Sequence, residues 1–182
     1  SLIDIFHKHP PDIYPGFWDK FNKYTDERFK KGELIILNYV FEELIRDTGI
    51  KKGDTEDPIA VWLYDRKKYI KDISTDISIL KQVKEILQKF PQAVDTEKIP
   101  EAADPYLIAY VLDQQKQIDI SGFKKTFVIV TEEMRNKNID IEKLKSRSNQ
   151  IPEITKIRSI CDYYDISSMD YLCLFRTEGW TF

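Results

Sequence analysis

Apolar residues recur along this chain in two patterns, one with the period of an α-helix and one as short continuous runs. Phe17, Trp18 and Phe21 have helical spacing, which predicts a helix over residues 12–24. The apolar runs at residues 33–37 and 127–130 are short enough for buried strands. Because the helical patterns alternate with these runs, we expect an α/β fold with a mostly parallel sheet that is flanked by helices.

Capping residues mark where several helices should begin. Asn38, Asp57 and Asp76 each precede a periodic stretch, and Pro58 follows at the first position of a helix. Further helices are expected from Asp104 onward, over residues 154–164 and over residues 169–178. Residues 31–32 and 165–168 are expected to be turns, and 136–149 a polar loop with some helical character. The predicted apolar face of the helix after Asp76 consists of Ile77, Leu80, Val83, Leu87 and Phe90.

Composition narrows the class of protein. The chain has 182 residues, of which 42% are hydrophobic, so we expect one domain with a sizeable core. The net charge of -3 provides no overall basic field for nucleic acid. Cys161 and Cys173 are too few for a disulfide framework, and we expect reduced, structural thiols in a cytoplasmic protein. No apolar run approaches the roughly 18 residues that a membrane span needs.

Carboxylates stand at the points where a binding site of an α/β fold is usually found. Asp104 opens a helix before Pro105, and Glu133 follows the strand over residues 127–130 by three positions. Ligands of open α/β sheets gather beyond the carboxyl ends of strands. The alternative is structural, because Asp-Pro is a common helix start and Glu133 could be a solvated residue of a helical first turn. Glu42 and Glu43 flank an apolar helix face, and periodicity does not choose between them.

The order of three short motifs resembles the PIN (PilT N-terminus) domain. These motifs are Phe-Glu-Glu-Leu at residues 41–44, Ala-Asp-Pro-Tyr-Leu-Ile-Ala at 103–109 and Val-Ile-Val-Thr-Glu-Glu at 128–133. Residues 1–4 look like the segment that comes after the opening aspartate of that family, so we expect a short strand upstream of Ser1. Residues 14–18 and 178–182 are similar to an uncharacterised prokaryotic subgroup related to VapC-type toxins.

The resemblance implies a three-layer α/β/α domain and a metal-dependent endoribonuclease. Glu43, Asp104 and Glu133 would be its catalytic and metal-binding residues, with Mg²⁺ or Mn²⁺ as the cofactor. The metal would neutralise charge on the phosphate and lower the pKa of a bound water. The implied partners are RNA and an antitoxin protein, with a homodimer as a candidate assembly and no membrane. The chain departs from the family in ending its last motif on Glu133 rather than aspartate, and in a longer segment over residues 113–126.

Other polar residues are candidates for contact with the substrate or for the core. Arg46 and Arg135 are the arginines nearest in sequence to the acidic motifs, and we expect them to contact phosphate, with Thr131 as a further substrate-binding residue. The remaining basic spots, such as residues 66–68, are expected to be solvated surface. His7 and His9 are expected in a loop without a metal. Trp18, Trp62 and Trp180 are expected in the core.

Two alternative functions stay open. One is a PIN scaffold that has lost its nuclease activity and binds a protein or RNA. Two features favour it: the family's opening aspartate is absent from this sequence, and Glu133 stands where the family has aspartate. The other is a phospho-acceptor receiver domain, which should carry a lysine on a late strand that we do not identify.

Overall fold

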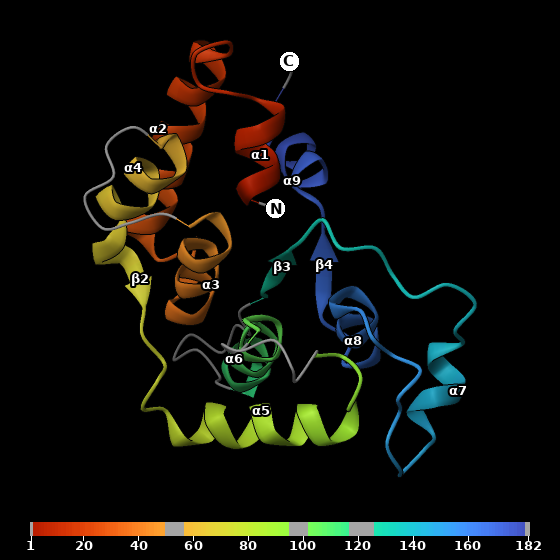
Figure 1. The fold of residues 1–182 in the computed structure, drawn as a ribbon. Helices are drawn as coiled ribbons and strands as arrows, with labels where there is room; N and C mark the ends of the chain where they lie inside the picture. Colours follow the sequence, from red (N-terminus) through yellow and green to blue (C-terminus); the bar gives the residue numbers. More distant parts are fainter. Residues whose placement is uncertain (1, 50–56, 95–101, 117–125, 181–182) are drawn as a thin grey trace. The chain divides into compact units, whose positions relative to one another are not determined.

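The computed structural model describes residues 2–49, 57–94, 102–116 and 126–180 (Figure 1). Contacts divide the chain into two compact units, which we describe separately. Unit 1 comprises Ser1–Ile73 together with Trp180–Phe182, and unit 2 comprises Ser74–Gly179. Within the described residues, helices alternate with short parallel strands, so the expectation of a mixed α/β fold is confirmed.

Unit 1 contains a helical body and one pair of strands. Its elements are α1 (Leu2–Lys8), α2 (Pro15–Lys31), β1 (Ile36–Leu37), α3 (Asn38–Thr48), α4 (Pro58–Asp65), the 3-10 turn η1 (Lys67–Tyr69) and β2 (Ile70–Lys71). Strands β1 and β2 run parallel, with Ile36 opposite Ile70. The predicted turn at residues 31–32 is confirmed, because Gly32 ends α2 with a φ of 67°, a left-handed conformation that favours glycine.

An aromatic cluster forms the core of unit 1. The ring centroids of Phe6 and Trp18 lie 4.2 Å apart, and those of Phe21 and Trp62 lie 5.7 Å apart. Trp180 packs against Phe17 at 6.1 Å. All three tryptophans are buried, which confirms the prediction that they belong to the core rather than to an exposed stacking surface.

Unit 2 combines two packed helices with a second pair of strands. Its elements are α5 (Ile77–Lys89), α6 (Asp104–Lys116), β3 (Val128–Val130), α7 (Ile141–Lys145), α8 (Ile157–Tyr163), β4 (Ser167–Met169) and α9 (Tyr171–Thr177). Helix α5 packs against α6, and α8 contacts both α6 and β4 (Figure 1). Strands β3 and β4 run parallel, with Val128 opposite Ser167 and Val130 opposite Met169.

Several predicted boundaries are wrong. Helix α2 begins at Pro15 and continues to Lys31, well beyond residue 24, because Thr25 and Phe29 carry its buried face onward. Only Ile36 and Leu37 of the run over residues 33–37 are strand. Asn38 is the first residue of α3 rather than its cap, and its side-chain oxygen accepts a hydrogen bond from the Ile73 N–H at 3.2 Å.

Further corrections concern unit 2. The predicted turn at residues 165–168 contains the start of β4, which exists because it pairs with β3. Helix α8 begins at Ile157 rather than at residue 154, and α9 spans Tyr171–Thr177 behind an Asp170 cap. On α5 the buried residues include Ile79, Val83 and Ile86, whereas the predicted Ile77 and Leu87 are exposed.

The structure also tests the predicted helix caps, the position of His7 and the burial of the two cysteines. The caps at Asp57 and Asp76 are confirmed, since each carboxylate accepts hydrogen bonds from two backbone N–H groups of its helix. His7 lies in the last turn of α1 instead of a loop. Cys161 is buried as expected, but Cys173 is exposed.

Parallel pairing is present, but the described strands form two sheets of two strands each. A three-layer arrangement around one central sheet therefore remains a prediction, as do the single domain over residues 1–182 and the strand upstream of Ser1.

Candidate functional site

Asp104 is the first residue of α6, as the sequence predicted. The carbonyl oxygen of the buried Ala103 accepts the first hydrogen bond of the helix, from the Leu107 N–H at 3.0 Å. The carboxylate of Asp104 is half-buried at the end of a helix whose next turns are almost entirely buried. A negative charge is favourable at this end because the unpaired N–H groups of the first turn point toward it.

A buried thiol on α8 shows which charged groups lie near Asp104. Burial raises the pKa of Cys161 to about 12, and the charges of Asp162 and Asp104 raise it in the same direction. Arg135 and Arg158 act on the thiol in the opposite direction. Carboxylates from α6 and α8 therefore lie near one fully buried sulfur atom, with two guanidinium groups in the same neighbourhood.

Asp162 is a candidate that the sequence did not indicate. It lies 58 positions after Asp104, inside a seven-residue helix, in no motif. Only the packing of α6 against α8 makes the two acids neighbours of the same thiol. No local pattern of residues carries that information.

The predicted acidic position after β3 has a structural partner. Glu133 accepts a hydrogen bond from the Ile157 N–H through Oε2 at 2.6 Å, and its Oε1 lies 3.1 Å from the Lys156 Nζ. Ile157 is the first residue of α8, so Glu133 caps that helix from a distant part of the chain. An ionised carboxylate has about four acceptor positions, and these two bonds leave others open.

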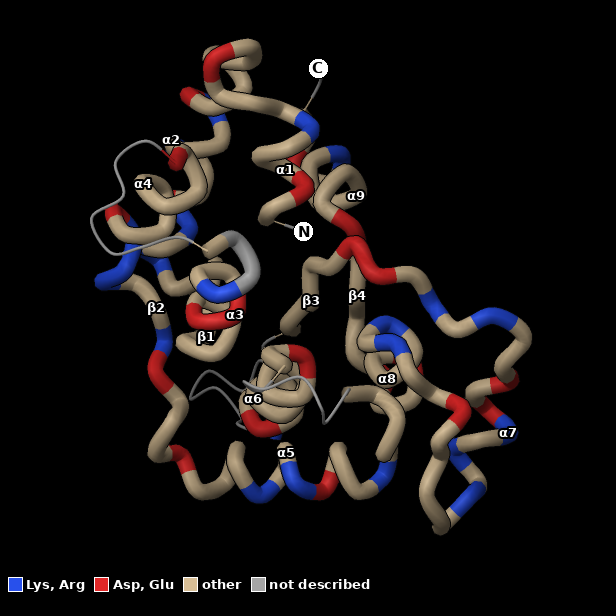
Figure 2. The backbone as a smooth tube through the Cα atoms, viewed as in Figure 1, with Lys and Arg blue, Asp and Glu red and all other residues tan. Residues whose placement is uncertain are grey.

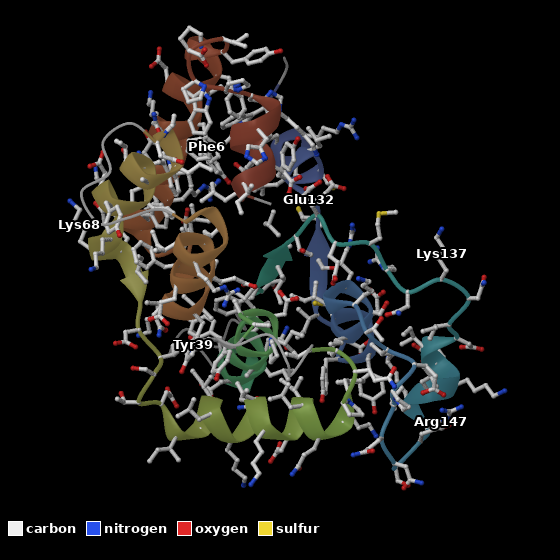
Figure 3. The ribbon with its side chains drawn as sticks, in the orientation of Figure 1. Phe6, Tyr39, Lys68, Glu132, Lys137 and Arg147 are labelled. Atoms are coloured by element: carbon white, nitrogen blue, oxygen red, sulfur yellow. The ribbon has the colours of Figure 1, made fainter. Side chains whose placement is uncertain are left out.

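Glu132 has the same role at the neighbouring helix. Its Oε1 accepts a hydrogen bond from the N–H of Tyr171, the first residue of α9, at 3.0 Å. Figure 2 shows the acidic stretch where the chain leaves β3, and Figure 3 shows the labelled Glu132 near the start of α9. Thr131 holds the turn, because its Oγ1 accepts a hydrogen bond from the Glu133 N–H at 3.2 Å. The three residues after β3 thus position two helices.

Arg135, predicted to bind phosphate, forms a two-point ion pair with Asp162. Its Nε and Nη2 donate to the two carboxylate oxygens at 2.6 and 3.1 Å. This hydrogen bonding raises the pKa of Arg135. Next to it, Asn136 accepts from the backbone N–H groups of Thr155 and Lys156, both at 3.1 Å, which holds the irregular segment beside α8.

The remaining predicted residues belong to unit 1. Glu43 is half-buried on α3, and its carboxylate lies 3.7 Å from Arg46 one turn later. Glu42 is exposed, so the two glutamates that periodicity could not separate differ in burial. Arg46 and Glu43 therefore lie together in unit 1, whereas Asp104 and Glu133 belong to unit 2.

Comparison with protein families gives one match. Residues 2–182 match the model of the family described as Domain of unknown function (DUF4411). The chain belongs to this family. No curated protein and no solved structure matches the sequence. The family description contains no activity, so the likeness to PIN domains stays a prediction.

The acidic side chains of this family member are of the type that binds a divalent cation. Carboxylate oxygens are the ligands that Mg²⁺ prefers. Among the described residues, however, no group of three or more His, Cys, Asp or Glu side chains could hold a metal ion. Glu43 belongs to unit 1 and Asp104 and Glu133 belong to unit 2, so the predicted set of three ligands stays a prediction. No helix in the described ranges is both long and apolar enough to cross a bilayer.

Proposed function

We propose that this chain is a metal-dependent endoribonuclease of the PIN type, and that it serves as the toxin of a toxin-antitoxin pair. The observation that carries the proposal is the position of Asp104, at the start of a buried helix and close enough to act on the Cys161 thiol, whose neighbour in sequence is a second acid, Asp162 of α8. The ordered acidic motifs of the sequence support it as well. Under the same proposal, the two parallel pairs belong to one central sheet of a three-layer domain.

In this proposal Glu43, Asp104 and Glu133 hold Mg²⁺ or Mn²⁺, which supplies charge neutralisation at the scissile phosphate and an activated water. Asp104 presents its carboxylate from a helix end that packing fixes. Arg46, Thr131 and Arg135 contact the substrate, where the planar guanidinium groups can bind phosphate through two donors. The partners would be RNA and an antitoxin protein, with assembly as a homodimer, in the cytoplasm.

Cleavage of labelled single-stranded RNA by the full-length native protein tests the proposal. We expect cleavage with Mn²⁺ that EDTA abolishes and that Asp104→Asn reduces at least about 100-fold. Asp76→Asn is the matched control, because it makes the same change at another helix start and asparagine still caps a helix. Cleavage that survives both EDTA and Asp104→Asn would belong to another protein, and the proposal would be wrong.

A second candidate function is a PIN scaffold that binds protein or RNA without cleaving it. The hydrogen bonds of Glu132 and Glu133 favour it, because both carboxylates already have structural roles at the starts of α8 and α9. The residue immediately upstream of Ser1 separates the two functions. An aspartate there favours the nuclease, and any residue without a carboxylate favours the binding module.

A further inference from the structure

Five lysines of unit 1 form what we call the basic patch. Its members are Lys30 and Lys31 at the end of α2, Lys67 and Lys68 in η1, and Lys71 in β2. All five side chains are exposed. Figure 2 shows the basic stretch between α4 and β2, and Figure 3 shows the labelled Lys68 at the edge of this unit.

Packing brings the two parts of the basic patch together. Phe29 precedes Lys30 directly, and its ring stacks on Tyr69 with centroids 5.3 Å apart and an interplanar angle of 3°. Tyr69 directly follows Lys68, so the last turn of α2 lies beside η1. The segments that carry these lysines therefore lie side by side, although the lysines are 36 to 38 positions apart in sequence.

The positive charge of the basic patch is not neutralised by ion pairs. Within the described ranges, none of its five lysines pairs with a carboxylate. The two nearest arginines do have such pairs, since Arg66 lies 2.9 Å from Asp26 and Arg28 lies 2.7 Å from Glu33. The other exposed acids in the same segments are fewer than the lysines; they are Glu27, Asp65 and Asp72. A local positive surplus thus exists on a protein whose net charge is -3.

Aromatic rings limit the freedom of two of these lysines. The Nζ of Lys68 lies 5.0 Å from the centroid of the Tyr69 ring, and that of Lys67 lies 5.9 Å from the Phe41 ring. Contacts of this kind hold an ammonium group over a ring face while it stays in water. The basic patch therefore presents partly ordered cations that remain accessible to a charged ligand.

We propose that the basic patch binds the phosphate backbone of single-stranded RNA, as a contact surface separate from the acids of unit 2. The choice of RNA rests on the proposed function. Lysine ammonium groups act as point charges on phosphates, so binding is independent of base sequence and depends strongly on salt. Each lysine–phosphate contact contributes about 0.7 to the slope of log affinity against log salt concentration for a single strand.

Fluorescence anisotropy with a labelled single-stranded RNA, in EDTA so that no metal-dependent cleavage occurs, tests this proposal. We expect the triple variant Lys67→Gln, Lys68→Gln, Lys71→Gln to bind at least about 10-fold more weakly and to reduce the salt slope by about 2. Lys30→Gln with Lys31→Gln should reduce it by about 1.4. The matched control is Lys81→Gln, Lys84→Gln, Lys143→Gln, which removes the same charge from exposed lysines of unit 2 and should leave binding within about twofold.

Equal weakening by the control variant would show that only net charge matters and would overturn the proposal. Unchanged RNA binding by the patch variants would also overturn it, as would loss of binding to vesicles rich in phosphatidylserine without loss of RNA binding. Hydrolysis of bis(p-nitrophenyl) phosphate with Mn²⁺ separates this result from the proposed function. Failure of hydrolysis in the wild type with RNA binding intact would reject the nuclease and keep the basic patch.

Discussion

Among the described residues, unit 1 leaves the lysines of its basic patch without carboxylate partners, whereas unit 2 ties lysines to carboxylates from other segments. In unit 2, Lys145 pairs with Asp165 at 2.7 Å and Lys156 with Glu133 at 3.1 Å. The difference follows from the helices of each unit, which need different amounts of support from the rest of the chain. Helices α7, α8 and α9 have five to seven residues, too few to be stable alone. Unit 1 has a 17-residue helix and an aromatic cluster to position its chain.

Charged residues of the described segments therefore have different roles in the two units: several acids of unit 2 cap helices, whereas the lysines of the basic patch in unit 1 do not. An acid of unit 2 that looks like a ligand in the sequence can be a cap for a short helix, as Glu132 and Glu133 are. Substituting it then changes both stability and any chemistry. In unit 1 the lysines of the basic patch take part in no ion pair or cap within the described ranges, so their substitutions report on binding.

The largest expected effect concerns a cation of unit 1 that, unlike the lysines of the basic patch, is buried and paired. Arg66 is buried, donates to the Asn22 side chain at 3.1 Å, and lies 4.5 Å from the Trp62 ring centroid. Its Nε lies 2.9 Å from an Asp26 oxygen, an ion pair that is not aligned as a hydrogen bond. We expect Arg66→Ala to lower the free energy of unfolding of unit 1 by about 2 to 3 kcal/mol, because Asp26 loses its ion-pair partner and Asn22 loses a donor. The loss stays below that of a fully buried ion pair because Asp26 is partly solvated.

Tryptophan fluorescence during urea unfolding measures this loss, because all three tryptophans of the chain belong to unit 1. Arg28→Ala is the control, since Arg28 forms its ion pair with Glu33 at the surface. Its effect should stay under about 1 kcal/mol. Equal losses in the two variants would contradict the structural role of Arg66.

The next prediction concerns Glu133, which caps α8 and is also a proposed metal ligand. Glu133→Ala removes the acceptor of the Ile157 N–H, and we expect it to cost about 1 to 2 kcal/mol of stability in unit 2. Glu133→Gln keeps a side-chain oxygen at the same reach and should cost less. Amide hydrogen exchange at Ile157 reads the cap directly, and its protection should fall in the alanine variant.

RNA cleavage by the glutamine variant then separates the cap from the ligand. A residue that binds a metal ion loses its charge in Glu133→Gln, so cleavage should be abolished although the helix stays capped. Full cleavage together with retained protection at Ile157 would limit Glu133 to its structural role.

Local signals predicted part of this fold. The caps at Asp57 and Asp76 and the turn at Gly32 depend on residues within one turn of the chain, and all three are confirmed. Strand β4 consists of Ser167, Ser168 and Met169, which have no apolar run, and it forms because β3 offers parallel partners. Such pairing is a tertiary effect that a window of sequence does not contain.

The candidate site shows the same division. The helix start at Asp104 was predictable from an aspartate before a proline. That Asp104 and Asp162 act on the same thiol was not predictable, because it depends on how α6 packs against α8. On α5, apolar residues occur at two overlapping helical spacings, and only packing selects the stripe that contains Ile79, Val83 and Ile86.

The smallest effect tests the buried thiol of unit 2 by its dependence on pH. Burial, with Asp162 and Asp104, raises the pKa of Cys161 to about 12 from an ordinary value near 9.0. At pH 10 the unfolded chain has released the thiol proton and the folded chain has not, so the stabilisation present below pH 9 is being lost. We expect this group alone to lower the free energy of unfolding by about 0.8 kcal/mol between pH 7 and pH 9.5.

Cys161→Ala should remove that part of the pH dependence, although the substitution itself costs stability at every pH. Tyr164, whose pKa burial also raises to about 12, adds a loss that begins near pH 10 and is present in both proteins. Urea unfolding at pH 7 and pH 9.5, followed by far-ultraviolet circular dichroism, therefore compares the two below the range where Tyr164 contributes strongly. If the wild type and Cys161→Ala lose equal stability over this interval, burial does not hold the Cys161 thiol protonated in the folded protein, and the prediction is wrong.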